Sequence, residues 1–77
     1  MSKLVPVHYE KLIQLFEHFG FKVTRYRGDH IMMNKSAVAR PLVIKTSPPR
    51  VATALIRINL TTAGISREEY FAVLAEL

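Results

Sequence analysis

The first apolar pattern in the chain has the spacing of an α-helix. The large apolar side chains of this segment recur at helical intervals, with charged and amide side chains between them: Leu12, Leu15, Phe16 and Phe19. This period is typical of one buried helix face. Gly20 follows directly, at the position where glycine commonly ends a helix in the left-handed conformation. His8 stands just before the segment, where it can cap the first turn. The pattern therefore predicts a helix from Tyr9 to Phe19.

Three strand-like segments follow this predicted helix. FKVTRYR (21–27) is rich in β-branched and aromatic residues and alternates in polarity, HIMMN (30–34) is a second short run, and PLVIKT (41–46) is a third. Runs of this kind, bounded by turn residues, are typical of half-buried strands. The leading Pro41 fits a strand start or an edge strand. We interpret residues 34–40, NKSAVAR, as a mainly polar connection.

Two further helices are predicted in the last third of the chain. SPPR offers Ser47 as an N-cap with a proline in the first turn. An apolar stripe follows, and Gly64 ends the helix: Val51, Ala54, Leu55 and Ile58. SREE has the pattern of a capping box, in which Ser66 and Glu69 satisfy each other's backbone donors. We expect the last helix to run from Arg67 to about Glu76 and to pack through Phe71 and Leu74, with Tyr70 or Leu77.

The order helix, three strands, helix, helix sets the predicted fold class. Short connections between successive strands make the sheet antiparallel. Helices on one face of such a sheet give an α+β two-layer sandwich. The other face is then open to solvent or to a partner. A chain of 77 residues with 49% hydrophobic residues is expected to form one domain over residues 1–77.

The register of the first hairpin decides which side chains share the open face. If the turn is residues 28–29 alone, Arg27 pairs with His30, and apolar and polar residues mix on each face. If the loop is residues 27–29, Tyr26 pairs with His30. That second register gathers four apolar side chains on one face: Phe21, Val23, Ile31 and Met33. One residue of slip exchanges the two faces of a strand, so we favour the three-residue loop. It places four side chains on the open face: Thr24, Tyr26, His30 and Met32.

Basic residues are concentrated in the middle of the chain. The net charge is +5, but residues 22–57 hold eight Lys or Arg residues against one acid, Asp29, and the rest of the chain is net −2. One-sided charge of this size is typical of a surface that binds a polyanion. A solvated basic face kept for solubility would have the same composition.

Two absences narrow the class of protein. The chain has no cysteine, which excludes a disulfide scaffold and suits a reducing compartment. No apolar run approaches the roughly 20 residues of a membrane span, and the first residues lack the apolar core of a signal peptide. We expect a soluble cytoplasmic protein with no membrane partner.

His30 is the candidate catalytic residue, although a lone strand histidine is more often simply an exposed polar side chain. Imidazole is well suited to moving a proton at neutral pH. With RNA, the substrate's own 2′-hydroxyl is the nucleophile, so a base, a cation clamp and good alignment suffice without a metal ion. We expect Arg25 or Arg27 and Lys45 to hold the phosphate and stabilise its charge. Tyr26 would stack on an unpaired base.

The remaining candidate residues support binding rather than chemistry. Arg50 and Arg57 lie seven residues apart, so they share one face of the predicted second helix and would extend the cationic path. His8 and His18 have no Asp, Glu or His partner at ligand spacing, so no metal site is expected. No Gly-rich phosphate loop or nucleophile elbow occurs, and no cofactor is expected.

Three stretches of the chain resemble the HicA, or YcfA-like, toxins of toxin–antitoxin pairs. The first is HFGFKVTRYRGDH, similar to that family's Gly-Phe…Arg…Gly-Ser-His signature; the second is RPLVI; the third is ATALIRINLTTAGISREEYFAVL. They follow one another in the family's order over nearly the whole chain. The resemblance implies an α-β-β-β-α fold similar to double-stranded-RNA-binding domains and a metal-independent mRNA interferase. It implies that His30 is catalytic, that Gly28 shapes the turn, and that a HicB-type antitoxin covers the site. We expect a monomer or weak dimer when the chain is free.

The chain also departs from the family pattern. Asp29 stands where the family usually has serine, and a carboxylate beside an imidazole favours its protonated form or weakens binding of an anionic substrate. A proline and a second histidine often follow the third strand in that family, but here residues 45–47 are Lys-Thr-Ser. Two alternatives therefore stay open. One is an RNA-binding module of the same fold without catalysis, and the other is a domain that docks a partner through its open sheet face or its third-strand edge.

Overall fold

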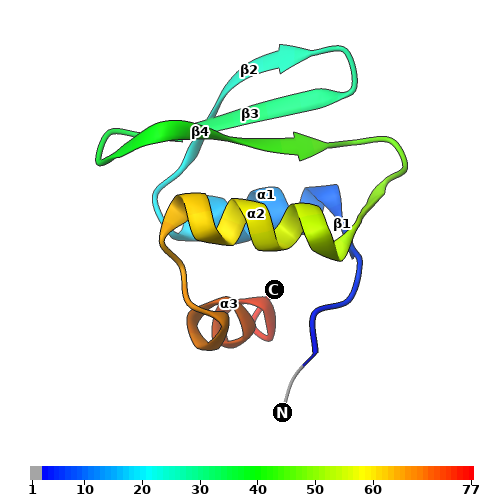
Figure 1. The fold of residues 1–77 in the computed structure, drawn as a ribbon, viewed down its shortest axis with the longest axis vertical. Coiled ribbons are helices and arrows are strands. Elements are labelled where there is room, and N and C mark those ends of the chain that lie inside the picture. Colours follow the sequence, from blue (N-terminus) through cyan, green and yellow to red (C-terminus); the bar gives the residue numbers. More distant parts are fainter. Residues whose placement is uncertain (1–2) are drawn as a thin grey trace.

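The order of elements along the chain is shown in Figure 1. The computed structural model describes residues 3–77, so the first two residues of the domain predicted over 1–77 lie outside the described part. A short strand, β1 (Val7–His8), leads into helix α1 (Tyr9–His18). Three longer strands follow: β2 (Lys22–Arg27), β3 (His30–Lys35) and β4 (Val38–Lys45). A second short strand precedes the last two helices: β5 (Arg50–Val51), α2 (Thr53–Ala63) and α3 (Arg67–Leu74).

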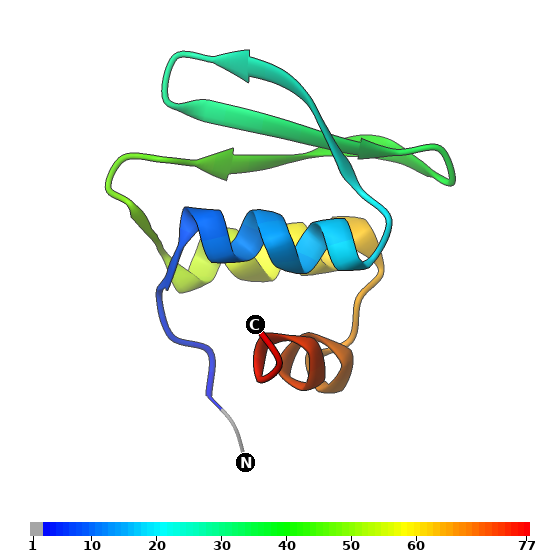
Figure 2. The ribbon, with the colours of Figure 1, turned by 180° about the vertical axis from the view of Figure 1, so that it is seen from behind.

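The predicted α+β class with a three-stranded antiparallel sheet is confirmed. The strand order is β2-β3-β4, and both neighbouring pairs are antiparallel. A separate antiparallel pair joins β1 to β5, which the sequence did not predict. Figures 1 and 2 show the sheet on one side of the molecule, α1 and α2 side by side beneath it, and α3 beyond these two helices.

One hydrophobic core joins the sheet to the helices. α1 buries the face that its period predicts: Leu12, Leu15 and Phe16. The sheet buries alternate residues of β3 and β4: Ile31, Met33, Leu42 and Ile44. Because successive side chains of a strand point to opposite faces, the residues between these four form the other, uncovered face. The start of α1 is capped as predicted, since the Glu10 N–H donates to His8 Nδ1 at 3.2 Å.

The turn between β2 and β3 is shorter than predicted. Arg27 pairs with His30, so the turn consists of Gly28 and Asp29 alone, and the prediction that Tyr26 opposes His30 is wrong. Gly28 has a φ of 58°, whereas Asp29 keeps a negative φ. A positive φ at the first central position only is the pattern of a type II′ turn, which matches the twist of the flanking strands. The glycine therefore favours the tight turn.

A β-bulge reconciles this tight turn with the apolar face. Thr24 is an extra residue in β2, because Val23 pairs with Met33 while Arg25 pairs with Met32. The Thr24 hydroxyl donates to the side-chain oxygen of Asn34. The bulge shifts the register by one residue within the strand. The half-buried Val23 thus shares the core side of the sheet with Met33, as expected, although the residues after the bulge have exchanged faces.

β4 begins earlier than the sequence predicted. Most of the expected connection over residues 34–40 is strand, and only residues 36–37 form the turn. Two extra residues of β4 are accommodated opposite β3 as an irregularity near Arg40 and Pro41. β4 is an edge strand, and an edge strand tolerates the missing N–H of Pro41.

α2 begins later than the N-cap prediction for Ser47. Residues 50–51 pair with β1 instead, and the helix begins at Thr53 after Ala52, which provides no side-chain cap. The Tyr9 N–H donates to the Pro49 carbonyl at 2.8 Å, which ties this segment to the start of α1. A residue that precedes proline is driven toward extended backbone. Ser47 and Pro48 each precede a proline, so both are disfavoured in the helical conformation, and residues 47–49 do not form the first turn of a helix.

The buried face of α2 is also rotated relative to the predicted stripe. Ile56 and Leu60, one turn apart, pack into the core, whereas the side chain of Ile58 is 59% exposed. The predicted stripe is therefore wrong for this helix: Ala54 and Ile58 are exposed, Leu55 is half-buried, and the buried Val51 belongs to β5. Ile58 remains as a large apolar side chain on the outer surface of α2.

Asn59 fixes α2 to the outer edge of β4. It is the only polar side chain buried within the described residues. The Val43 N–H donates to Asn59 Oδ1 at 3.3 Å, and Asn59 Nδ2 donates to the Val43 carbonyl at 3.0 Å. Val43 lies on the side of β4 that is not paired with β3, so the asparagine amide takes the place of a neighbouring strand. This contact satisfies two backbone groups of the β4 edge that would otherwise be free to pair with another strand.

The capping box at the start of α3 is confirmed. The Glu69 N–H donates to Ser66 Oγ at 3.1 Å, and the Ser66 N–H donates to Glu69 Oε1 at 2.9 Å. Hydrogen bonding to the carboxylate lowers the pKa of Glu69. Tyr70 is the residue of α3 that is fully buried, while Phe71 and Leu74 are half-buried at the core margin.

Candidate nucleic-acid interface

A row of three side chains crosses the uncovered face of the sheet at its turn end. His30 lies at the start of β3, with Arg27 of β2 as its partner on one side and Lys45 of β4 as its partner on the other. Directly paired residues point to the same face, with Cβ atoms about 4.5–5.5 Å apart. The His30 side chain is 47% exposed, so a solvent-borne ligand can reach it. We call this set, Arg27, His30 and Lys45, the cationic row.

A second row continues the same face one pleat further from the turn. Arg25 pairs with Met32, and Met32 pairs with Val43. Residues two apart in a strand point to one face, so Arg25 lies on the same side of the sheet as the cationic row. The described face therefore presents three permanent cations around one imidazole, a suitable setting for a bound phosphate.

Asp29 lies beside the imidazole and also fixes the turn. Its Oδ1 is 3.5 Å from His30 Nδ1, an ion-pair distance if the ring is protonated. The Asp29 carbonyl accepts hydrogen bonds from the Thr46 N–H at 2.8 Å and from Thr46 Oγ1 at 3.0 Å. The turn is thereby held against the end of β4. Since Nδ1 faces the carboxylate, Nε2 is the nitrogen left to meet a substrate.

A groove adjoins the cationic row where α2 meets the edge of β4. Its volume is about 550 Å³, within the size range of ligand sites. The sheet contributes five lining residues, and α2 contributes four: His30, Arg40, Pro41, Val43 and Lys45, with Leu55, Ile58, Asn59 and Thr62. The groove thus joins the uncovered sheet face to the outer surface of the helix.

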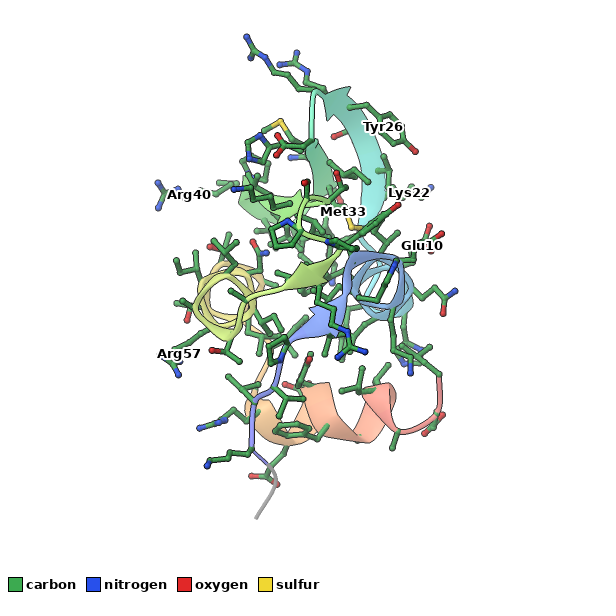
Figure 3. All side chains as sticks on the ribbon, turned by 90° about the vertical axis from the view of Figure 1, so that its right-hand side faces the viewer. Glu10, Lys22, Tyr26, Met33, Arg40 and Arg57 are labelled. Carbon is green, nitrogen blue, oxygen red and sulfur yellow. The ribbon has the colours of Figure 1, made fainter. Side chains whose placement is uncertain are left out.

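Three predicted binding residues lie away from this face. Tyr26 pairs with the core residue Ile31, so it projects from the other side of the sheet, where it is 73% exposed. Figure 3 shows Tyr26 and Arg40 on opposite sides of the sheet, with Arg57 directed away from it. Arg50 lies in β5, not in a helix, so the shared helix face predicted for Arg50 and Arg57 is wrong.

The surroundings of these two arginines differ as well. Arg50 pairs with His8 across the short ladder and lines a hollow beside the start of α1. Arg57 lines a separate hollow with Arg67 on the far side of α2. The structure therefore brings together Arg25, Arg27 and Lys45 around His30, and it leaves the other candidates apart.

The sequence reasoning missed the residues of the groove. Arg40 precedes the proline of an edge strand, and that dipeptide was the only available signal for an irregularity there. Asn59 stands between the apolar residues Ile58 and Leu60, and a buried polar side chain in such a place normally has a hydrogen-bond partner. Ile58 and Thr62 are identified only by the rotation of α2.

The remaining histidines have structural surroundings. His8 caps α1, and its ring stacks on Tyr9. His18 lies in the last turn of α1, where a cation suits the helix dipole. Within residues 3–77, no three side chains of His, Asp or Glu come close enough to hold a metal ion together. Nor does this part of the chain contain a helix with the length and hydropathy to cross a membrane.

Two comparisons with known proteins were made for this chain. No protein-family model matches it, and no curated protein matches it. The structure shows an α+β fold, and any function has to be argued from the cationic row and its surroundings.

Proposed function

We propose that this chain is a metal-independent endoribonuclease of the HicA type, an mRNA interferase. The observation that carries the proposal is the cationic row, in which His30 stands between Arg27 and Lys45 on an uncovered sheet face. RNA is the substrate class that needs least from the protein, because its 2′-hydroxyl is held next to the phosphate it attacks. Structured or single-stranded mRNA fits a site of this small size.

The proposed reaction is an internal transesterification. His30 Nε2 removes the proton of the 2′-hydroxyl, and the 2′-oxygen forms a bond to the adjacent phosphorus. The bond from phosphorus to the 5′-oxygen breaks, and the imidazolium returns its proton to that oxygen. The products are a 2′,3′-cyclic phosphate and a free 5′-hydroxyl. Arg27 and Lys45 stabilise the charge that develops on the phosphoryl oxygens, and Arg25 holds the approaching backbone.

The resemblance to HicA toxins supports the same assignment through different residues. It covers the turn before His30, the strand RPLVI and the closing segment with its capping box. It further suggests that a HicB-type antitoxin binds over the face of the sheet that the helices leave open. A nuclease that cleaves mRNA would act in the cytoplasm. Asp29 is then the departure from the family that matters most, because its carboxylate lies 3.5 Å from Nδ1 of the proposed catalytic histidine.

A second candidate is an RNA-binding module without catalysis. The three cations around His30 would bind RNA whether or not the imidazole moves a proton, and Asp29 would then only balance charge. The third possibility is a domain that docks a partner through its open sheet face or through the edge of β4, and the edge of β4 is the disfavoured one of these two surfaces. Asn59 already occupies the Val43 backbone groups, and Pro41 has no N–H to offer.

The test is an analysis of the products of RNA cleavage. The purified chain would be incubated with a labelled RNA and a chelator, beside the same sequence made as DNA. We expect cleavage of RNA alone, with 2′,3′-cyclic phosphate ends. Binding without cleavage would favour the non-catalytic module. Cleavage of DNA, or 3′-hydroxyl ends, would contradict the mechanism because neither can come from attack by a 2′-oxygen.

A further inference from the structure

The groove between β4 and α2 combines apolar walls with cations at its ends. Val43 and Ile58 are two large apolar side chains with unusual exposure, 39% and 59%, and both line this groove. Lys45 and His30 lie toward one end of β4, and Arg40 lies toward the other. Arg40 and Lys45 are five residues apart, or about 16 Å at the rise of a strand.

The direction of α2 orders the groove from end to end. Figure 1 shows α2 running back beneath β4 in the opposite direction. Asn59 is bonded to Val43 at the middle, so Leu55 lies toward the Lys45 end and Thr62 toward the Arg40 end. Along the groove, a ligand would therefore meet a cation, an apolar patch, and then a hydroxyl and a second cation.

This order fits a nucleotide that has a phosphate on each side. A phosphate at the cationic row directs the next nucleotide either off the sheet or along β4 toward Val43, which shares the uncovered face with that row. No acidic side chain lines the groove among the described residues, although Asp29 lies 3.5 Å from His30 at one end, so cations of the lining attract a phosphate at each end. Aliphatic side chains take up the flat face of a base by burying apolar surface. An extended protein strand fits less well, because Asn59 occupies the backbone edge that it would use.

We propose that this groove binds the nucleobase next to the phosphate held by His30. The base lies between Val43 and Ile58, Thr62 offers its hydroxyl to the base edge, and Arg40 holds the following phosphate. This subsite rests on the proposed function for its link to cleavage, and it would set which nucleotide flanks the cut. Its binding of a nucleotide can be measured without cleavage.

The experiment is an NMR titration of the isotopically labelled chain with a nucleoside 3′,5′-bisphosphate. We expect the bisphosphate to shift the amides of Val43, Ile58 and Thr62. Inorganic pyrophosphate, which has no base, should shift only residues beside the cations. Ile58→Asp should weaken bisphosphate binding by about tenfold, the effect of losing one good contact. Thr61→Asp adds the same charge at an exposed position of α2 outside the groove and should leave it unchanged. Ile58→Ala gives a smaller loss without a new charge.

Several outcomes would overturn the subsite. Shifts confined to the cationic row, or equal affinity of wild type and Ile58→Asp, would show that only phosphates bind. Groove shifts with an amphipathic acidic peptide but not with the bisphosphate would assign the groove to a protein partner. The two proposals separate cleanly. If Ile58→Asp cleaves RNA at the same rate and the same sites as wild type, the subsite is wrong and the nuclease proposal stands. If the chain binds the bisphosphate in the groove but never cleaves RNA, the subsite stands and the nuclease proposal is wrong.

Discussion

The side-chain amide of Asn59 is expected to contribute measurably to the free energy of unfolding. Its two hydrogen bonds to Val43 join α2 to the edge of β4, in addition to the packing of the two elements in the core. A net hydrogen bond contributes about 1 kcal/mol, so Asn59→Ala should lose about 2 kcal/mol. Alanine returns about 0.5 kcal/mol through its higher helix propensity. Val43 is partly exposed, so water satisfies some of its freed groups. The expected net loss is about 1.5 kcal/mol.

The assay is urea unfolding followed by circular dichroism. For a chain of 77 residues, a slope near 1 kcal/mol/M turns this loss into a midpoint shift of about 1.5 M. The melting temperature should fall by about 10 °C. Asn59→Asp keeps an acceptor for the Val43 N–H but sets an oxygen against its carbonyl, so it should destabilise more than alanine does. Thr61→Ala, on the exposed side of α2, should change stability by less than about 0.5 kcal/mol. If Asn59→Ala unfolds at the same urea concentration as Thr61→Ala, the edge contact does not hold the two elements together.

The remaining predictions concern α3 and the RNA-binding face. The Tyr70 hydroxyl is buried without a partner within the described residues, so Tyr70→Phe should be neutral or raise the free energy of unfolding by about 1 kcal/mol. Burial raises the pKa of Tyr70, so the unfolded state releases this proton first and stability falls above about pH 10; the phenylalanine variant should lose less stability there, by alkaline melts. Ser66→Ala should cost about 1 kcal/mol in urea unfolding. Hydrogen bonds hold the pKa of Glu69 below its ordinary value of 4.5, so the charged carboxylate stabilises the fold above pH 4.5. This stabilisation is lost as the pH falls, and Glu69→Gln should reduce the loss of stability in acid. Arg27→Ala and Lys45→Ala should each reduce the salt slope of RNA binding by about 0.7, and an unchanged slope would place the phosphates elsewhere.

Sequence periodicity predicted the elements whose pattern is local. α1, the order of the three strands and the capping box of α3 depend on residues a few positions apart, and all three are present. The turn was mispredicted because two devices act together. Gly28 favours a two-residue turn, and the bulge at Thr24 then restores the apolar register of Val23. Treating the strand as regular forces a choice between these two features.

The cationic row of the candidate site could be predicted from the sequence, whereas the groove could not. His30, Arg27 and Lys45 come together because neighbouring strands of one antiparallel sheet bring them together, so strand order nearly suffices. The groove depends on how α2 is rotated about its axis, and Asn59 sets that rotation through a contact sixteen residues away in the chain. Apolar spacing alone placed Ile58 inside. The side chain that distinguishes the observed buried face of α2 from the predicted one is the buried amide of Asn59, and hydrophobic periodicity takes no account of a buried amide.

The most direct measurement of the central claim compares RNA cleavage by wild type, His30→Ala and His18→Ala. His18 is an exposed histidine on α1, so its removal controls for the loss of an imidazole from the surface. Single-turnover rates would be measured in chelator, with RNA affinity measured in parallel. We predict that His30→Ala abolishes cleavage while RNA affinity is largely retained, and that His18→Ala cleaves as wild type does. Cleavage by His30→Ala at the wild-type rate would contradict the role of this imidazole in the cationic row.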